Sequence, residues 1–424
     1  MSKLALLGGE KTVKIDYETA GNLPCVNEKG LETAVDLMRK GQISTSPLVK
    51  EFEKRFAEYI GTEYGLCSNN GTSSLHEALF AAGVGPGDEV IVPSYTFWAT
   101  AGPIVSAQGN PVFADVDKET YNLDPKAIEK NITSRTKAIM VVHVWGNPAD
   151  MDAIMAIARK YNIAVIEDCS HAHGAMLNGK KVGSIGDLGC FSLQASKTMP
   201  GGEGGILTTN NREYFERAVA LGHYERLADL PEDSDYRKYS LTGMGYKYRI
   251  HPIAVALASS AFDELDERNE IRNRNGKALE KGLEGIDCII PQKVLDGAVR
   301  QYSYHFATYD ETKLDNIPLE VFLKALKEEG VACGFCGYGR LHKAPLFTER
   351  DNFRHVELPV TEYLATHTFM MAPRFEKECP ELIDQYIEAY HKVVNNADEL
   401  KEYAAKNEDL NAAANISGRS INLL

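Results

Sequence analysis

The sequence predicts an α/β protein of two domains, the larger of which contains a mostly parallel sheet covered by helices. Its 424 residues exceed what one core usually holds, because single cores stop growing near roughly 250–300 residues. Hydrophobic residues make up 44% of the chain and charged residues 25%, the balance of a globular protein that buries a sizeable core. Between residues 63 and 210, short β-branched runs alternate with segments of helical period, a pattern typical of parallel strands joined by helices.

Six segments of the larger domain have the pattern of strands. Several are nearly continuous apolar runs, as expected when both faces of a parallel sheet are covered. The six are residues 89–93, 111–116, 138–145, 164–168, 190–193 and 205–209. Between them, Met151, Ile154, Met155 and Ala158 recur at helical spacing, which predicts a helix over residues 150–161.

The pattern changes past about residue 265 and predicts a second α/β domain with an antiparallel sheet. A charged helix is expected at residues 263–285, and the last helical segment at 381–403. We therefore expect a larger domain over residues 1–262, which includes the N-terminal segment, and a smaller one over residues 263–406. Residues 407–424 are polar and aperiodic, so a loosely ordered tail is expected there.

The charge balance predicts a small-molecule partner. The formal net charge is −14, from 46 basic and 60 acidic residues, which opposes binding to nucleic-acid phosphates or to an anionic membrane. No stretch approaches 18 apolar residues, and no signal-cleavage pattern follows Met1, so a cytoplasmic location is expected.

The cysteines predict no metal site. Of the eight, only Cys333 and Cys336 have C-x-x-C spacing, and no second pair or histidine follows at the spacing that zinc ligands need. Reduced thiols are the expectation.

A first candidate for chemistry is the run S-N-N-G-T-S-S at residues 68–74, which leads into an apolar helical pattern. A helix that opens with a Gly-Thr-Ser turn presents free backbone N–H groups, hydroxyls and a positive dipole end to an anion. Thr72 and Ser73 are thus candidate phosphate ligands. Alternatively, one of them simply caps the helix, which is the usual role of such residues.

A second candidate is Asp168, which ends an apolar strand and precedes His171 by three residues. Ligands of open α/β sheets lie beyond the carboxyl ends of the strands. A buried carboxylate at that place needs a cationic or hydrogen-bonding partner, which a pyridinium N–H could supply. Alternatively, Asp168 caps the next turn.

A third candidate is Lys197, which follows a buried strand and precedes four glycines within residues 201–205. A lysine that forms a Schiff base must be partly desolvated to lower its pKa, and glycines permit close approach of the backbone to a ligand. The alternative is a solvated loop lysine.

Together, the anion site, the carboxylate and the amine follow the order that pyridoxal 5′-phosphate (PLP) requires. Lys197 would hold the cofactor as a Schiff base, and Asp168 would keep the ring nitrogen protonated so that the ring can accept electrons.

From about residue 41 to 375, the chain resembles the DegT/DnrJ/StrS family of PLP-dependent aminotransferases, fold type I enzymes that aminate keto-sugars and cyclitols. The resemblance implies a large domain with a mostly parallel sheet of the seven-stranded type and a smaller C-terminal α/β domain. Its specific stretches are N-G-T at 70–72, E-V-I-V-P-S at 89–94, A-D-M-D at 149–152, E-D at 167–168, F-S at 191–192, Lys197 and G-E-G-G at 202–205.

The resemblance also implies roles for single residues. Lys197 and Asp168 match the catalytic pair. Thr72, Ser73 and Ser192 look like phosphate ligands. Phe97 matches the aromatic residue that stacks on the cofactor ring, with its neighbour Trp98 a weaker candidate, and His171 matches the position that contacts the ring face or its 3′-oxygen.

One position departs from the family pattern. Where the family has Gly-x-Asn-x-Arg, residues 245–249 read G-Y-K-Y-R. The family's asparagine reaches the cofactor phosphate of the neighbouring subunit, and Lys247 could make the same contact with a full charge. The resemblance implies a homodimer whose subunits complete each other's active sites.

The family contains dehydrating members in which a histidine replaces the lysine, so Lys197 favours transamination. The resemblance implies a donor, glutamate or glutamine, and an acceptor that is a nucleotide-linked keto-sugar or a keto-cyclitol of the scyllo-inosose type. Residues 300–304 and 340–347 resemble the cyclitol branch, and His342 either approaches the substrate or packs a loop. The alternatives are a PLP-dependent dehydratase or aromatising synthase of the same family, and a non-catalytic regulatory paralogue.

Overall fold

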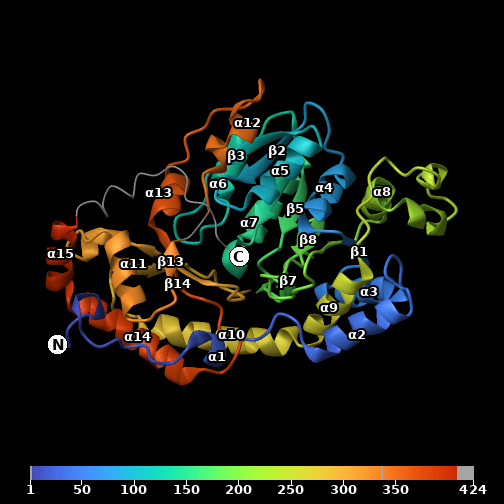
Figure 1. Cartoon of the computed structure of the whole chain (residues 1–424). Coiled ribbons are helices and arrows are strands. Elements are labelled where there is room, and N and C mark those ends of the chain that lie inside the picture. The colour runs from blue at the N-terminus through green and yellow to red at the C-terminus, as the bar shows by residue number, and fades with distance from the viewer. Residues whose placement is uncertain (1, 336–337, 408–424) are drawn as a thin grey trace.

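A seven-stranded sheet forms the centre of the computed structural model, which describes residues 2–335 and 338–407 (Figure 1). The strand order is β1-β9-β8-β5-β4-β2-β3. The strands are β1 (Tyr64–Ser68), β2 (Glu89–Pro93), β3 (Asn110–Ala114), β4 (Thr136–Val142), β5 (Ala164–Asp168), β8 (Leu188–Ser192) and β9 (Gly205–Thr209). Strands β3, β2, β4, β5 and β8 pair in parallel, whereas β9 runs antiparallel to both β8 and β1. The expected α/β class and mostly parallel sheet are therefore confirmed.

All six predicted strands are present, and two deviations have local causes. Strand β1 was not predicted, since its five residues contain a glycine and show no β-branched run. The strand predicted over residues 138–145 ends at Val142 instead. Trp145 has a φ of 56°, which a strand cannot accommodate, so the chain turns away from the sheet.

Helices cover both faces of this sheet, which explains the continuous apolar runs of its strands. Val90 and Val92 pack with one set of helices, whereas Ile91, between them in the same strand, packs with the other set. On the first face lie α4 (Gly71–Ala81), α5 (Trp98–Ser106) and α8 (Arg212–Gly222). On the opposite face lie α3 (Pro47–Ile60), α6 (Pro125–Asn131), α7 (Met151–Tyr161) and α9 (Pro252–Asp263).

A second, antiparallel sheet is formed by the C-terminal part of the chain, as expected. Its order is β10-β12-β14-β13. The strands are β10 (Ile289–Pro291), β12 (His305–Tyr309), β13 (Gly334–Phe335) and β14 (Thr368–Ala372). The accompanying helices are α10 (Leu265–Gly282), α11 (Leu319–Glu328), α13 (Pro359–His367), α14 (Pro380–Asn395) and α15 (Ala397–Lys406).

Helix α10 connects the two sheets, and the last predicted helix is divided in two. Helix α10 runs along the base of the molecule from α9 toward α14 (Figure 1), and so spans the two sheets. The single helix predicted at residues 381–403 is in fact two, α14 and α15. They separate at Asn396, whose side chain donates a hydrogen bond to the carbonyl of Lys392 at 2.7 Å.

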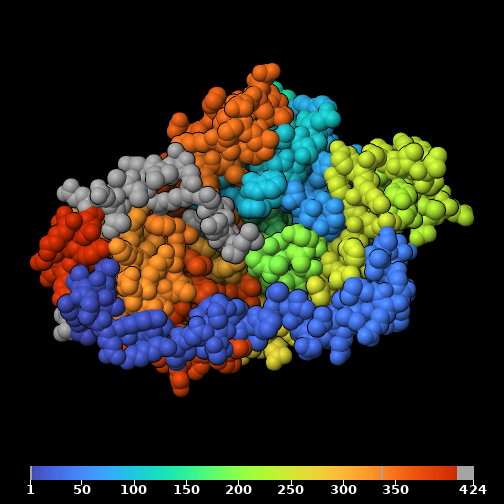
Figure 2. Space-filling view, viewed as in Figure 1, coloured from blue at the N-terminus to red at the C-terminus, as the bar shows by residue number. Residues whose placement is uncertain are grey.

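The packing differs from the expected division of the chain in two places. Leu4 and Val13 belong to the core that surrounds the C-terminal sheet, and Figure 2 shows the N-terminal segment, in blue, lying along the C-terminal helices. Conversely, Leu341 and Phe347 pack with Phe113 of the larger sheet. The boundary near residue 262 stays a prediction, and residues 408–424, most of the expected tail, lie outside the described residues.

Among the described residues, no helix is both long enough and apolar enough to cross a membrane.

The start of β9 gives a testable prediction about stability. A Cβ atom at Gly205 would lie 2.5 Å from the carbonyl oxygen of Asn70, at the opening of α4. Gly205→Ala should therefore lower the free energy of unfolding by about 1–3 kcal/mol, because the backbone must shift. Chemical denaturation measures this effect.

Gly85→Ala is the matched control, because no heavy atom lies within 4 Å of a Cβ atom built there. An equal loss of stability in both variants would contradict the close contact between β9 and the start of α4.

Candidate active site

Asp168 lies at the carboxyl end of β5, where it is buried and held by two hydrogen bonds. Its Oδ2 accepts a bond of 2.8 Å from the hydroxyl of Thr100, and its Oδ1 accepts one of 3.1 Å from the backbone N–H of Ser170. The second bond is the turn cap that the sequence suggested as an alternative role. Because a carboxylate offers about four lone-pair positions, Asp168 can serve both roles and still accept a further donor.

Lys197 lies on the loop between β8 and β9. Hydrogen bonds across the loop run from Ala195 N to the Gly202 carbonyl at 2.9 Å and from Gly201 N to the Leu193 carbonyl at 2.7 Å. Gly202 has a φ of 85°, a conformation that glycine adopts without steric cost. The glycine run thus folds the loop back on itself and fixes the place of Lys197.

Burial lowers the pKa of the Lys197 amine from 10.5 to about 8. The charge of Asp168 opposes this shift, and the charge of Arg374 adds to it. An appreciable fraction of the amine is therefore neutral near physiological pH, which is the form that acts as a nucleophile. A solvated loop lysine would keep its ordinary pKa, so that alternative does not agree with the structure.

The opening of α4 is capped by Asn70, not by Thr72 or Ser73 as the sequence suggested in one interpretation. The Asn70 side chain accepts a hydrogen bond of 2.8 Å from Ser73 N, and the Ser73 hydroxyl donates one of 2.7 Å to the Asn69 side chain. The Thr72 hydroxyl has no hydrogen-bond partner among the residues that the structure describes. Capping by Asn70 leaves Thr72 available to a ligand.

Ser192, at the end of β8, lies against this helix opening. A Cβ atom at Gly71 would be only 3.0 Å from the Ser192 Cβ, so the glycine allows the two segments to meet. Hydroxyl groups and the first N–H groups of α4 are thereby gathered at one place, an arrangement that suits a phosphate.

His171 is buried in a stack of aromatic rings. Its ring lies 5.0 Å from that of Trp145, at an interplanar angle of 6°, and its Nδ1 lies 3.1 Å from the hydroxyl of Tyr338. Burial holds the pKa of His171 well below its ordinary value, and the charges of Lys197 and His173 lower it further. The imidazole is therefore neutral and fixed in orientation.

Phe97 and Trp98 stay exposed at the start of α5, where 39% and 51% of their surfaces are accessible. Large exposed aromatic side chains next to one another are informative, because soluble proteins usually cover them. Lys247 is also exposed, and within the described part of the chain it makes no hydrogen bond or ion pair. The chain therefore brings Asp168, Lys197 and His171 together, whereas Lys247 lies on the surface.

Residues 24–389 match the model of the DegT/DnrJ/EryC1/StrS aminotransferase family. The chain belongs to this family. Its members include sugar and cyclitol aminotransferases as well as some dehydratases, and PLP is the cofactor of the aminotransferases. The chain is therefore a PLP-dependent aminotransferase.

Relatives of known sequence or structure agree with this assignment over nearly the whole chain. A putative L-glutamine:3-amino-2,3-dideoxy-scyllo-inosose aminotransferase of Streptoalloteichus tenebrarius is 33% identical over 428 residues, which cover 94% of this chain and 100% of that protein. A solved aminotransferase from Psychrobacter cryohalolentis has a TM-score of 0.81 at 27% identity and covers 89% of this chain and 100% of its own. The structure of 3-amino-5-hydroxybenzoic acid synthase has a TM-score of 0.75 at 28% identity, with coverages of 89% and 99%. These structures confirm the expected fold.

The residues present in this family member suit PLP. Asp168 retains lone pairs for a ring N–H donor, the Thr72 hydroxyl and the α4 opening suit a phosphate, and Lys197 supplies a partly neutral amine. The sequence identified all three.

His342 joins two segments of the aminotransferase by hydrogen bonds to Ser94 and Glu362. Its Nδ1 lies 2.7 Å from the Ser94 hydroxyl, and its Nε2 lies 3.1 Å from Oε1 of Glu362. Burial lowers the pKa of His342, although the charge of Glu362 opposes the shift. Both ring nitrogens are occupied, which favours the loop-packing interpretation. Ser94 begins the segment that leads to Phe97, so His342 holds that segment in place.

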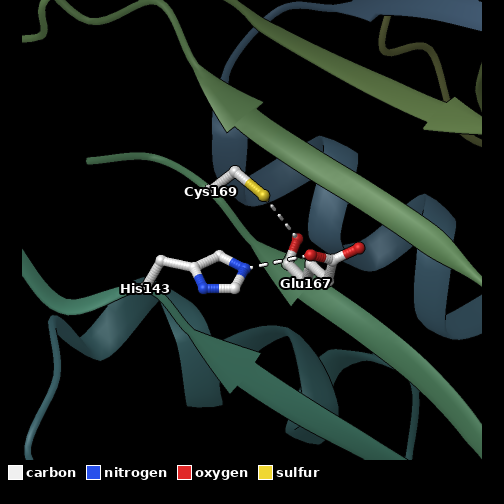
Figure 3. Close-up of side chains that lie close together, drawn as sticks. All are labelled: His143, Glu167 and Cys169. Carbon is white, nitrogen blue, oxygen red and sulfur yellow. Dashed lines mark hydrogen bonds and ion pairs between the residues drawn. The ribbon is translucent and has the colours of Figure 1, made fainter. Parts of the chain in front are cut away.

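His143, Glu167 and Cys169 form a buried group whose atoms lie close enough together to hold a metal ion (Figure 3). The contacts of this group are hydrogen bonds that hold neighbouring segments of the fold together. Nδ1 of His143 accepts a hydrogen bond from Ala149 N, so its proton lies on Nε2, 3.0 Å from Oε2 of Glu167. The Glu167 carboxylate also accepts three backbone N–H groups from residues 183–186, which uses its lone pairs.

Four residues that contact or act on the site were not identified from the sequence: Thr100, Trp145, Tyr338 and Arg374. Trp145 is the last residue of the strand predicted over residues 138–145, and its place at the carboxyl end of a predicted strand was a signal that could have found it. Thr100 lies in the first turn of α5. Tyr338 and Arg374 come from the C-terminal part of the chain, and only the tertiary structure brings them to His171 and Lys197.

The pKa of Lys197 gives a prediction for the cofactor-free protein. Labelling of Lys197 by an amine-reactive reagent should rise with pH and reach half its maximum near 8. In Asp168→Asn, the midpoint should fall, because the carboxylate charge that stabilises the ammonium is lost. Peptide mass spectrometry at a series of pH values measures both midpoints, and a wild-type midpoint near 10.5 would contradict the burial of the amine.

Proposed function

We propose that this aminotransferase moves the amino group of L-glutamine or L-glutamate to a ketone on a cyclitol ring of the scyllo-inosose type. The similarity to the Streptoalloteichus tenebrarius protein supports this acceptor class, because it extends over 94% of this chain and all of that protein. Nucleotide-linked keto-sugars are the second acceptor class that the family resemblance suggests.

The observation that carries the proposal is the buried, partly neutral amine of Lys197, on which the charge of Asp168 acts. Bound PLP supplies an aldehyde that condenses with amines and a protonated ring that withdraws electrons from the carbon next to the nitrogen. Asp168 would accept the ring N–H, and Thr100 and Ser170 N would hold the carboxylate in that orientation. Thr72, Ser73, Ser192 and the start of α4 would bind the phosphate.

Lys197 has two tasks in this proposal. Its neutral amine would hold the cofactor between turnovers, and after release it would take the proton from the α-carbon of the donor. A base works best when its pKa lies near the working pH, and the pKa of about 8 for Lys197 meets that condition. His171, which stays neutral, and Phe97 would lie on the ring faces and exclude water.

The remaining proposals concern assembly and location. Lys247 is exposed and has no partner in its own described chain, so we propose that it reaches the cofactor phosphate of a second subunit in a homodimer. The cytoplasmic location stays a prediction.

The aminotransferase reaction gives the decisive test. With L-glutamine as donor, the purified protein should convert a keto-cyclitol to the aminocyclitol with all ring hydroxyls retained, as mass spectrometry of the product shows. Lys197→Ala should lose this turnover almost entirely and should lack the borohydride-reducible bond to the cofactor, because no other amine replaces Nζ. A reduced adduct on another lysine would contradict the assignment of Lys197.

The second candidate function is an aromatising or dehydrating synthase, which the similarity to 3-amino-5-hydroxybenzoic acid synthase supports. The same assay separates the two, because a product that has lost water and gained no nitrogen would exclude amino transfer. A protein that binds PLP but converts neither class of ketone would favour the regulatory paralogue.

The role of Lys247 can be tested by mixing two variants. Lys197→Ala and Lys247→Ala should each have low activity, whereas a refolded equimolar mixture should regain up to about a quarter of wild-type activity. Half of the dimers would then be hybrids, each with one intact site, because the two residues of a shared site come from different subunits. If Lys247 acts only within its own subunit, mixing will restore nothing.

A further inference from the structure

Three buried or partly buried charges, two positive and one negative, lie next to the Lys197 loop. Arg272 of α10 and Arg374, which follows β14, share one carboxylate, that of Glu376. Arg272 donates to Oε2 of Glu376 at 2.9 Å from Nε and at 2.6 Å from Nη2, and Arg374 donates to Oε1. Arg272 and Glu376 are only 1% and 3% exposed. Two cations are therefore balanced by a single anion.

Glu376 and Arg272 are both ionised at neutral pH. Burial acts to raise the pKa of Glu376, but the charges of Arg374 and Arg272 outweigh it and lower the pKa. Burial lowers the pKa of Arg272 to about 10, partly offset by Glu376, and the charge of Arg374 lowers it further. A cation in a poorly hydrated place is stabilised by a counter-ion. The Arg374 side chain is 17% exposed, so an anion from outside can reach it.

The guanidinium of Arg374 is the part of the cluster that can receive it. Nε is bonded to Glu376, and Nη1 donates a hydrogen bond of 3.0 Å to the carbonyl of Ser196, next to Lys197. Nη2 makes no hydrogen bond with any residue in the described ranges 2–335 and 338–407. The guanidinium carbon lies 5.8 Å from the centre of the Tyr304 ring, and the charge of Arg374 acts on Lys197.

The chemistry of the reaction identifies the anion. In the proposed function the cofactor phosphate lies at the start of α4, and a cyclitol ketone carries no charge. A nucleotide-linked keto-sugar carries its charge on the diphosphate, away from the ketone that reacts at the place of Lys197. An amino-acid donor, by contrast, carries its carboxylate on the same carbon as the amine that must reach the place of Lys197. A fixed guanidinium beside Lys197 therefore matches the donor carboxylate in both charge and position.

We propose that Nη2 of Arg374 binds the α-carboxylate of the amino donor and that Glu376 and Arg272 hold the guanidinium in the required orientation. This inference rests on the proposed amino transfer. Through the carbonyl of Ser196, the same arginine also fixes the backbone next to Lys197, so the donor site and the catalytic lysine share one support.

The first test uses the holoenzyme and two donors that differ only in the carboxylate, L-glutamine and 4-aminobutanamide. The rate at which each donor removes the visible absorbance of the bound cofactor gives kcat/KM for the donor step. Arg374→Gln should lower this value for L-glutamine by roughly 30-fold or more, the effect of losing a charged hydrogen bond. For 4-aminobutanamide it should change the value by less than about threefold.

Arg374→Lys should show an intermediate loss, because an ammonium keeps the charge but cannot contact Glu376, Ser196 and the donor together. Arg274→Gln is the matched control, since Arg274 lies on the same helix as Arg272 but pairs with Glu378 on the surface. An equal loss for both donors in Arg374→Gln would overturn the proposal and leave Arg374 as a support of the lysine loop only.

The second test does not depend on turnover. Titration of the holoenzyme with propionate, a simple carboxylate, should raise the pH midpoint of the visible absorbance band, because a bound anion offsets the charge of Arg374. The midpoint of Arg374→Gln should not respond. If no donor reacts with the wild type, the proposed function fails, and this shift still decides the carboxylate site. Absence of the shift in the wild type, or an equal shift in both proteins, would overturn it.

Discussion

The rest of the site depends on the pKa of the Lys197 amine, which burial lowers and the charge of Asp168 raises. Without burial, Lys197 would be fully charged and unreactive at neutral pH. Without Asp168, the burial of a cation would have no compensation from a nearby negative charge. The pKa of about 8 is the balance of these two effects, with Arg374 as a third contribution.

The parallel sheet provides that balance because its strands end at one edge. Asp168 ends β5 and Ser192 ends β8, and these two strands are neighbours in the sheet. Thr100 reaches Asp168 from α5, and the start of α4 meets Ser192 because Gly71 has no side chain. Asp168, Ser192, Thr100 and Thr72 thus lie on strands and helices, whereas Lys197 lies on a loop, which the glycine run folds back.

The C-terminal half of the chain adds a second set of contacts around the same place. Tyr338 orients His171, His342 holds the segment that leads to Phe97, and Arg374 fixes the backbone beside Lys197. A shift of these segments relative to the larger sheet would therefore alter both the orientation of the ring contacts and the charge around the amine.

The sequence by itself determined the α/β class, six strands of the main sheet, and the identity of Asp168, Lys197 and the helix start at Thr72. Those features are local, because apolar runs, glycine spacing and the residues after a strand can be read along the chain. Only the tertiary structure decided that Asn70 caps α4, that the chain leaves the sheet at Trp145, and that Tyr338 and Arg374 reach the site. These contacts join residues that are far apart in sequence, and burial and charge compensation depend on neighbours in space, which no local pattern records.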